Sequence, residues 1–194
     1  MHIFYLLLSI LIFHTEIGLQ SLNTVDNFTL TNATDGSSFS LSTLKSSPAI
    51  VVIFTSNHCP YDKLYHSRLS KLMDTYQARN VKFVLINSND PGRSPENTVQ
   101  QMAKRIKGLR WNVPYLIDAN REVASRFGAR KNPEAYVLQY RDNTFQVLYG
   151  GSIDDNPQVA ADVSDAYLSS ALDAVLAGKP VLVNETHATR CMIK

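Results

Sequence analysis

Cysteine is scarce in this sequence: Cys59 and Cys191 are the only two among 194 residues. Two cysteines are too few for the disulfide framework of a small secreted scaffold, and no Cys-x-x-Cys pair indicates a zinc site. In an oxidising compartment the two thiols can join, or each can react with a partner. The fold is therefore expected to depend on the hydrophobic core of one domain of ordinary size.

A strong excess of charge of either sign is also absent. The formal net charge of +2 gives no indication of a nucleic-acid partner. Lys104, Arg105, Lys107 and Arg110 gather on one predicted helix, which we interpret as a solvated face and not as a phosphate-binding stripe. No internal repeat or low-complexity segment occurs. Hydrophobic content of 44% with 19% charged residues is typical of a globular protein.

No apolar run reaches the roughly 20 residues that span a bilayer. Residues 3–13 are almost continuously apolar, interrupted by Ser9, which fits the core of a signal peptide over residues 1–20. We therefore expect export to the periplasm or the extracellular space, with no stable membrane insertion. An uncleaved N-terminal anchor is the alternative, because no Lys or Arg precedes the run and no clear small-x-small site precedes Gln20 or Ser21. No cysteine follows the run, so lipoprotein processing is not supported.

The most informative segment surrounds Cys59. Residues 49–54 form an apolar, β-branched run of strand length, and the polar residues 55–58 follow it. Cys59 then stands directly before Pro60, which fits the first position of a helix because proline has no N–H to leave unpaired. A cysteine at a helix N-terminus is favoured as the reactive thiolate. This position, at the carboxyl end of a strand, is where open α/β sheets carry their sites.

The remaining pattern alternates strands with helices. Strands are predicted at 28–30, 39–41, 50–54, 81–86, 115–117, 135–138 and 145–149, and helices at 60–79, from 94 through 106, at 118–127 and at 163–176. This order predicts an α/β fold with a mixed central β-sheet flanked by helices and an N-terminal β-hairpin. The domain is expected to span residues 21–183, followed by a tail, 184–194, that carries Cys191 and that we expect to be mobile.

This layout resembles the thioredoxin fold, and within it the alkyl hydroperoxide reductase/thiol-specific antioxidant (AhpC/TSA) family with its peroxiredoxin-like relatives. Residues 54–61, Phe-Thr-Ser-Asn-His-Cys-Pro-Tyr, are similar to the active-site segment of exported redoxins. Residues 132–137, Asn-Pro-Glu-Ala-Tyr-Val, resemble the family's Thr-Pro-Glu stretch, which implies a cis peptide bond at Pro133 and a groove beside Cys59. The alternative is an ordinary trans turn proline. The ending 190–194 resembles the Gly-Cys-Ser/Thr-Ile-Lys tail of the same subgroup.

Several departures from the family pattern limit what the resemblance implies. Thioredoxins carry a second cysteine where this chain has Asp62, so a Cys-x-x-Cys pair cannot resolve an oxidised Cys59. The peroxiredoxin pattern Pro-x-x-x-Thr/Ser-x-x-Cys is met at Ser56 but not at Val52, where proline would stand. Arg130 is a candidate for the arginine that steadies the thiolate. The resemblance therefore implies a one-cysteine thiol redox role more directly than peroxidase activity.

Within that role Cys59 is the expected nucleophile, attacking a disulfide or a peroxide. Cys191 is either the resolving thiol or a free or intermolecular one. His58 either stabilises the thiolate and shuttles protons or is a loop histidine without such a role. Asp62 is expected to oppose the thiolate by like-charge repulsion.

Three functions remain open at this point. The leading hypothesis is an exported thiol-disulfide oxidoreductase or peroxiredoxin-like antioxidant enzyme. The second is a thiol peroxidase in which Cys59 reacts with peroxide, and the third is a redox-inactive thioredoxin-fold module that binds a peptide. The expected partners are a protein disulfide or peroxide substrate and an external, thioredoxin-like thiol reductant. No cofactor, metal or nucleic acid is expected.

Overall fold

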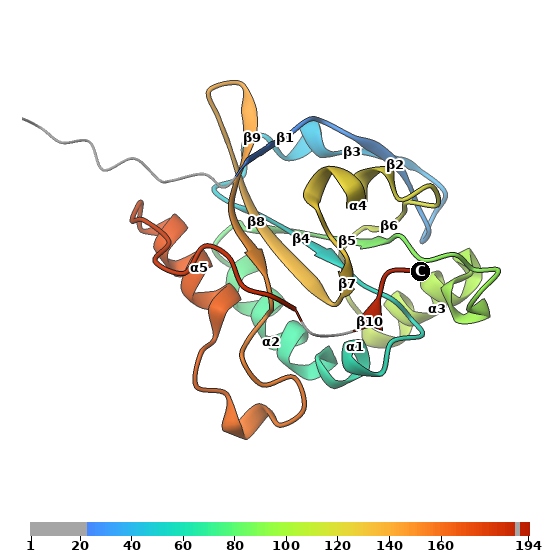
Figure 1. Ribbon diagram of the computed structural model, residues 1–194. Coiled ribbons are helices and arrows are strands. Elements are labelled where there is room, and N and C mark those ends of the chain that lie inside the picture. The colour runs from blue at the N-terminus through green and yellow to red at the C-terminus, as the bar shows by residue number, and fades with distance from the viewer. Residues whose placement is uncertain (1–22, 189–190) are drawn as a thin grey trace, which may run out of the picture.

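The computed structural model describes residues 23–188 and 191–194, so the predicted signal peptide at 1–20 lies outside the described residues. A mixed eight-stranded sheet forms the centre of the molecule (Figure 1). Its strands, in spatial order, are β1 (Asn23–Val25), β9 (Thr144–Gly151), β8 (Glu134–Arg141), β4 (Ile50–Phe54), β5 (Lys82–Asn87), β6 (Tyr115–Ile117), β2 (Thr29–Asn32) and β3 (Ser38–Ser40). The neighbours β4, β5 and β6 run parallel and the other pairs antiparallel. The predicted mixed sheet is confirmed.

Helices cover both faces of this sheet. They are α1 (Pro60–Leu64), α2 (His66–Gln77), α3 (Val99–Leu109), α4 (Glu122–Phe127) and α5 (Tyr167–Leu176), with short 3₁₀ turns at η1 (Leu41–Leu44), η2 (Pro95–Asn97) and η3 (Ala160–Asp162). Helices α2, α3 and α5 contribute to one core cluster, whereas α4 and η1 contribute to a second. The two sets lie on opposite sides of the sheet (Figure 1).

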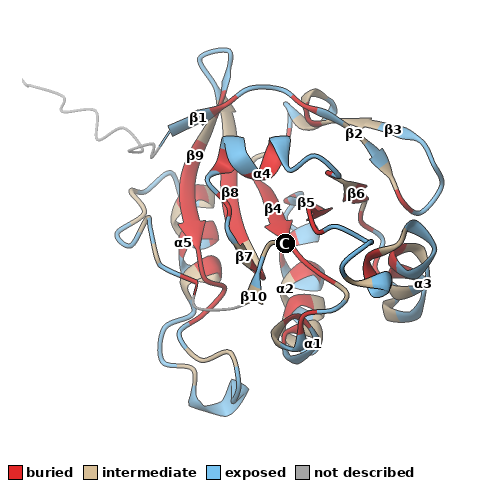
Figure 2. Cartoon of the chain, turned by 45° about the vertical axis from the view of Figure 1, so that its right-hand side comes forward, coloured by how far each residue is buried: buried red, intermediate tan, exposed pale blue. Residues whose placement is uncertain are grey.

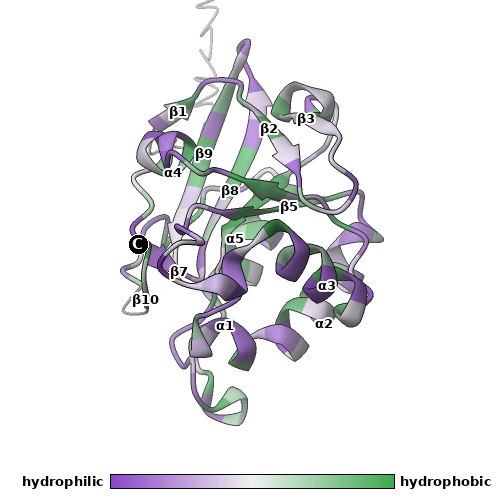
Figure 3. Ribbon diagram, turned by 90° about the vertical axis from the view of Figure 1, so that its right-hand side faces the viewer, coloured by the Kyte–Doolittle hydropathy of each residue, from purple (hydrophilic) through white to green (hydrophobic). Residues whose placement is uncertain are grey.

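The central strand β4 shows why both faces must be covered. All five of its residues are buried (Figure 2). Successive side chains on a strand point to opposite faces, so Val51 and Ile53 enter the α2/α3/α5 core while Ile50, Val52 and Phe54 enter the α4 core. Figure 3 shows the hydrophobic residues concentrated on central strands such as β5 and β8. Cys59 follows β4 by a short loop and is therefore held by the most buried part of the fold.

The predicted N-terminal hairpin is confirmed, with β2 antiparallel to β3 and Leu30 opposite Phe39. The predicted helix over 60–79 is divided at Tyr65 into α1 and α2. The backbone N–H of Tyr65 is shared between the carbonyl oxygens of Tyr61 and Asp62, at 3.3 and 3.2 Å. A shared bond of this kind tightens the turn locally. Figure 1 shows α1 as a separate short turn in front of α2.

Other boundaries differ for local reasons. The serine-proline start at 94 produces only the turn η2, and α3 begins after Thr98. Helix α4 begins at Glu122 and not at 118. The carboxylate of Asp118 accepts the N–H groups of Val123 and Ala124 in its first turn, at 3.2 and 2.9 Å. Helix α5 begins at Tyr167 and not at 163. Two unpredicted strands, β7 (Lys131–Asn132) and β10 (Cys191–Met192), pair only with each other in the described parts of the chain.

Candidate functional site: the Cys59–Cys191 disulfide

Cys59 lies at the N-cap of α1, at the carboxyl edge of the parallel strands, as the sequence predicts. Its backbone is extended (φ −69°, ψ 121°), and Pro60 takes the first helical position. Helix α1 has only five residues before the division at Tyr65. The helix-dipole contribution at Cys59 is therefore smaller than an unbroken helix to residue 79 would give.

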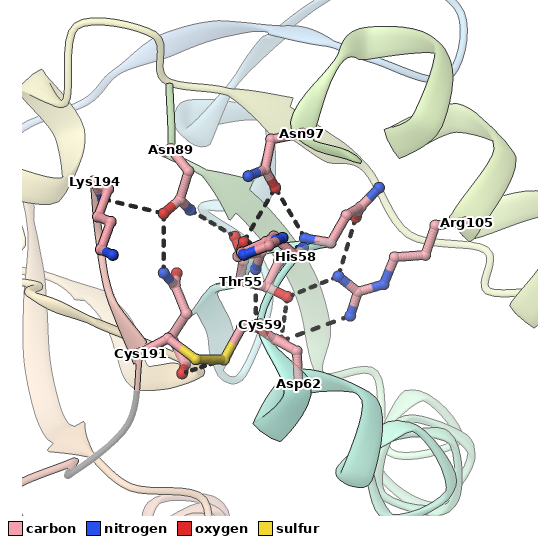
Figure 4. Close-up of a disulfide and its surroundings, with 12 residues drawn as sticks. Thr55, His58, Cys59, Asp62, Asn89, Asn97, Arg105, Cys191 and Lys194 are labelled. Atoms are coloured by element: carbon pink, nitrogen blue, oxygen red, sulfur yellow. Dashed lines mark hydrogen bonds and ion pairs between the residues drawn. A yellow bond between two sulfur atoms is a disulfide. The ribbon is translucent and has the colours of Figure 1, made fainter. Parts of the chain in front are cut away.

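A disulfide joins Cys59 to Cys191, 132 residues later in the sequence (Figure 4). The two Cα atoms are 6.0 Å apart, inside the range of ordinary disulfides. Cys59 is 1% exposed, whereas Cys191 is partly exposed. Cys191 is thus the more solvent-exposed of the two cysteines.

Residues 191–194, here called the strap, are held beside the site by backbone pairing. Strand β10 runs antiparallel to β7, with Cys191 opposite Asn132 and Met192 opposite Lys131. The N–H of Ile193 then donates to the carbonyl oxygen of Arg130 at 2.9 Å. We expected a mobile tail, and in this structure backbone pairing and the disulfide join these four residues to the domain.

The end of the strap rests on the loop that follows β5. Lys194 donates its N–H to the side-chain oxygen of Asn89 at 3.2 Å and accepts the N–H of Asp90 at 2.7 Å (Figure 4). The same Asn89 oxygen accepts the side-chain N–H of Asn132 at 3.2 Å. Asn89 therefore connects the strap to β7.

The Asn132–Pro133 peptide bond is cis, in agreement with the geometry that the resemblance implies. It stands between β7 and β8, and the carbonyl oxygen of Asn132 lies 3.3 Å from the Cys59 sulfur. Pro133 therefore directly follows the residue whose carbonyl oxygen contacts the Cys59 sulfur.

Asp62 is fully buried and does not face solvent beside the thiol. Its carboxylate accepts the hydroxyl of Thr55 and, at 2.9 Å, the N–H of Ser56. The Arg105 guanidinium lies 3.6 Å from the same carboxylate (Figure 4). Burial raises the pKa of Asp62, and the charge of Arg105 opposes that rise. The repulsion that we expected between Asp62 and a Cys59 thiolate is thus partly neutralised by Arg105.

Arg105 extends from α3 to several parts of the Cys59 loop. Besides Asp62 it donates to the Thr55 hydroxyl at 3.2 Å and to the side-chain oxygen of Asn57 at 3.1 Å. Its side chain is only 9% exposed. The interpretation of residues 104–110 as a solvated face is therefore wrong at Arg105, which is turned inward while Lys104 is exposed.

His66, at the start of α2, meets the other side of Arg105 with its Nε2 at 3.1 Å. Burial, followed by the positive charges of Arg105 and Lys63, lowers the pKa of His66 to about 4. The imidazole is thus neutral at pH 7 and accepts a hydrogen bond from the guanidinium. Its ring also lies edge-on to Trp111, with centroids 5.7 Å apart.

The other predicted site residues occupy different surroundings. His58 is 61% exposed, and its Nδ1 lies 3.4 Å from Glu96. Ser56 is buried; its hydroxyl donates to Asn97 at 3.1 Å and accepts the N–H of His58 at 3.2 Å. Arg130 is exposed.

The greater part of the chain matches a known protein family. The family model described as "AhpC/TSA family" matches residues 22–151, which run from just before β1 to the end of β9. The chain belongs to the AhpC/TSA family. No match is found among curated proteins. Membership of AhpC/TSA is consistent with a thiol redox function, and the predicted family and thioredoxin-like fold are confirmed.

Solved structures show how far the AhpC/TSA chain resembles individual proteins. A hypothetical protein from Sinorhizobium meliloti 1021 is 34% identical with a TM-score of 0.81, covering 91% of this chain and 95% of that one. An uncharacterised conserved protein from Geobacillus kaustophilus has the same identity and TM-score, covering 91% and 92%. A secreted disulfide oxidoreductase from Mycobacterium tuberculosis is 19% identical with a TM-score of 0.54, covering 77% and 94%, which shows a shared fold.

The sequence analysis did not identify Arg105 or the three asparagines Asn87, Asn89 and Asn97 as residues of the site. Asn87, Asn89 and Asn97 are buried beneath the Cys59 loop, where the Asn97 oxygen accepts from Ser56, from the N–H of Asn57 and from Asn87. The available signal was the polar run that follows β5, since parallel strands end at one edge of a sheet. Within residues 23–188 and 191–194, no group of His, Cys, Asp and Glu is arranged to hold a metal ion, and no helix is long and apolar enough to cross a membrane.

Proposed function

We propose that this protein is a thiol-disulfide oxidoreductase that cycles between a Cys59–Cys191 disulfide and a dithiol. The single observation that carries the proposal is the contact between the only two cysteines of the chain, at the carboxyl edge of the parallel strands. Asp62 replaces the second cysteine of a Cys-x-x-Cys motif, so Cys191 is the only other thiol of the chain that could resolve an oxidised Cys59. The disulfide with Cys59 supports the assignment of Cys191 as the resolving thiol.

The proposed cycle balances in sulfur, electrons and protons. The Cys59 thiolate attacks one sulfur of a substrate disulfide, which forms a mixed disulfide and releases the other substrate sulfur as a thiolate that takes up a proton. The Cys191 thiol, losing its proton, then attacks Cys59 and releases the second substrate thiol. The substrate gains two electrons and two protons, and the protein becomes the Cys59–Cys191 disulfide.

An external dithiol reductant, of the thioredoxin class, completes the cycle. Because Cys59 is 1% exposed and Cys191 is partly exposed, the reductant is expected to attack the sulfur of Cys191. Cys59 then leaves as the thiolate. The reductant is oxidised to a disulfide, and the protein returns to the dithiol form.

Three observations favour disulfides over peroxides as the substrate. The Ser56 hydroxyl is engaged by Asn97 and by the N–H of His58. The guanidinium of Arg105 faces Asp62, Asn57 and His66, and Arg130 is exposed. A peroxidase needs hydrogen-bond donors directed at the bound peroxide, and these side chains are directed elsewhere. We assign Pro133 to shaping the groove beside Cys59. We assign the exposed His58 to the solvent-facing rim of that groove.

Export is part of the proposal. The apolar run at 3–13 supports a signal peptide over 1–20, and the secreted M. tuberculosis oxidoreductase shares the fold. In the periplasm or outside the cell, the oxidised form would be maintained unless a dedicated reductant were supplied.

Turnover assays test the proposed activity. The reduced protein is mixed with a peptide disulfide or with hydrogen peroxide, in the presence of a thioredoxin-type reductant, and consumption of reductant is followed. We expect turnover with the peptide disulfide, none with Cys59→Ser, and slow turnover with Cys191→Ser. Turnover with peroxide alone would replace this proposal by the peroxidase hypothesis, and an inert Cys59 would leave the peptide-binding module.

A further inference from the structure

A cleft lies beside the Cys59 loop and takes part in no step of the proposed cycle. Its volume is about 470 Å³, within the range of small-ligand sites. Its lining includes five polar side chains from the loop and from three helices: Asn57 of the loop, Lys63 of α1, His66 of α2, and Lys104 and Arg105 of α3. Figure 4 shows Arg105 on the side of Asp62 away from the Cys59–Cys191 disulfide, so the strap does not cover this cleft, here called the basic cleft.

Positive charge dominates the basic cleft. Lys63 and Lys104 are exposed, and no carboxylate forms a salt bridge with either of them in the described part of the chain. The His66 imidazole senses the same field, since burial and then the charges of Arg105 and Lys63 lower its pKa to about 4. The basic cleft therefore favours a negatively charged ligand over a positively charged one.

The Arg105 guanidinium has one unused hydrogen-bond donor. Its two terminal nitrogens are engaged by four side chains, those of Thr55, Asn57, Asp62 and His66. Its Nε is buried and has no hydrogen-bond partner among residues 23–188 and 191–194. A buried donor without a partner is costly, so an acceptor that enters the cleft beside Arg105 would relieve that cost. A carboxylate combines such an acceptor with the negative charge that the basic cleft favours.

One negative charge already lies among the residues that line the basic cleft. The side chain of Glu96 is 53% exposed, and its carboxylate is 3.4 Å from Nδ1 of the exposed His58. Glu96 forms no salt bridge with Lys63 or Lys104. It therefore weakens the attraction of the basic cleft for an anion without neutralising the two lysines through a salt bridge.

The basic cleft is within reach of a substrate that reacts at Cys59. Lys63 follows Cys59 by four residues on α1, which is about 6 Å along the helix axis. Two residues of an extended peptide span about 7 Å. An acidic side chain two residues from the cysteine of a substrate can therefore reach Lys63 while the substrate sulfur meets Cys59.

We propose that the basic cleft binds a carboxylate of the disulfide substrate, so that the protein prefers polypeptide disulfides flanked by acidic residues. This inference rests on the proposed function and adds the class of substrate. Lys63, Lys104 and Arg105 donate to the carboxylate, and the substrate sulfur is held beside Cys59 as a result. The exchange of disulfides is the one already proposed, and the cleft adds no chemical step to it.

Two capped peptides test this preference: acetyl-Glu-Ala-Cys-Ala-Glu-amide, and the same peptide with glutamine in place of both glutamates. The caps remove the terminal charges, and each cysteine is activated as a mixed disulfide with the neutral leaving group 2-thiopyridine. In reduced Cys191→Ser protein the Cys59 thiolate attacks the peptide sulfur, and the released thiopyridine takes up a proton and is followed by its absorbance. We expect the glutamate peptide to react about fivefold faster than the glutamine peptide, the upper end for one exposed ion pair.

Variants of the lysines locate the effect. Lys63→Gln/Lys104→Gln, made in the same Cys191→Ser protein, should reduce the ratio of the two rates to about one. The control Lys71→Gln/Lys82→Gln removes the same charge at two exposed lysines that do not line the cleft, and it should leave the ratio unchanged. Glu96→Gln should raise the ratio. A ratio that both double variants lower equally, that neither lowers, or that Glu96→Gln lowers would overturn the basic cleft.

A binding measurement separates the two proposals. The oxidised wild type is titrated with acetyl-Glu-Ala-Ser-Ala-Glu-amide, which has no thiol to exchange, and with its glutamine counterpart, and NMR follows the His66 imidazole and the Asn57 amide. Saturable shifts with the glutamate peptide alone are expected, and equal shifts with both peptides, or none, would overturn the basic cleft. Equal exchange rates for the two disulfide peptides would also overturn it and would leave thiol exchange intact. A Cys59 thiol that reacts with neither peptide would contradict the proposed function itself, and the titration would then decide the basic cleft alone.

Discussion

Arg105→Gln is predicted to destabilise the fold through the loop that carries Cys59. The guanidinium is the charge partner of Asp62, which is 0% exposed, and is itself 9% exposed. It also donates to Thr55 and Asn57. Removing it leaves a buried carboxylate without its counter-charge and takes one donor from each of Thr55 and Asn57. The side-chain oxygen of Asn57 keeps the hydrogen bond from the Tyr115 hydroxyl at 3.0 Å.

The expected magnitude follows from these contacts. Breaking a buried ion pair by removing one partner costs about 3–5 kcal/mol. Asp62 keeps the bonds from Thr55 and from the N–H of Ser56, so we expect the lower end, about 3 kcal/mol in the free energy of unfolding. Asp62→Asn removes the charge that needs compensation. The double variant Asp62→Asn/Arg105→Gln should therefore lose about 1–2 kcal/mol less than the sum of the single losses.

Urea unfolding of the oxidised proteins at pH 7, followed by circular dichroism, measures these differences. Lys104→Gln is the matched control, because Lys104 is the exposed neighbour of Arg105 on the same helix; it should stay within about 0.5 kcal/mol of the wild type. The reasoning is refuted if Arg105→Gln behaves like Lys104→Gln, or if the two single losses add in the double variant.

Three further predictions concern pH, redox state and thiol reactivity. The pKa of His66 is lowered from 6.5 to about 4, so the unfolded chain binds a proton before the folded protein does as the pH falls, and the free energy of unfolding should decrease toward pH 4. Because His66 is partly exposed, we expect His66→Gln to remove about 1 kcal/mol of the decrease measured between pH 7 and pH 4.5. An unchanged pH dependence in this variant would contradict the assignment. Reduction of the Cys59–Cys191 bond, which closes a loop of 132 residues, should lower the free energy of unfolding by about 2–4 kcal/mol; identical urea midpoints for both redox states would be inconsistent with it. Asp62→Asn leaves Arg105 without its anion, so the reduced Cys59 thiol should be alkylated faster at pH 7, and an equal or slower rate would show that Asp62 does not act on the thiol.

The parts of the fold that local sequence determines could be predicted. Strand β4 has an apolar run buried on both faces, and the hairpin of β2 and β3 surrounds a turn at Gly36, whose φ of 73° suits glycine. The placement of Cys59 follows from Pro60 by the same local logic. These features depend on neighbouring residues and on burial, both of which are written in the pattern of the sequence.

The parts that depend on distant partners could not be predicted. Strands β7 and β10 are two residues each and exist because they pair with one another across the chain. Arg105 belongs to a basic cluster whose spacing is that of a solvated helix face, and only the position of Asp62 in three dimensions explains why it is buried. Tyr65, at which the predicted helix is divided, has a partner that is distant in sequence, since its buried hydroxyl donates to Asp154 at 2.7 Å.

The central claim is that Cys59 attacks first and Cys191 resolves. Mass spectrometry of the reduced Cys191→Ser and Cys59→Ser proteins, each quenched with acid after brief mixing with a peptide disulfide, tests it most directly. We predict a mixed disulfide between the peptide and Cys59 that accumulates in Cys191→Ser, and no adduct on Cys191 in Cys59→Ser over the same time. An adduct that forms on Cys191 as fast as on Cys59, or none on Cys59, would contradict the account.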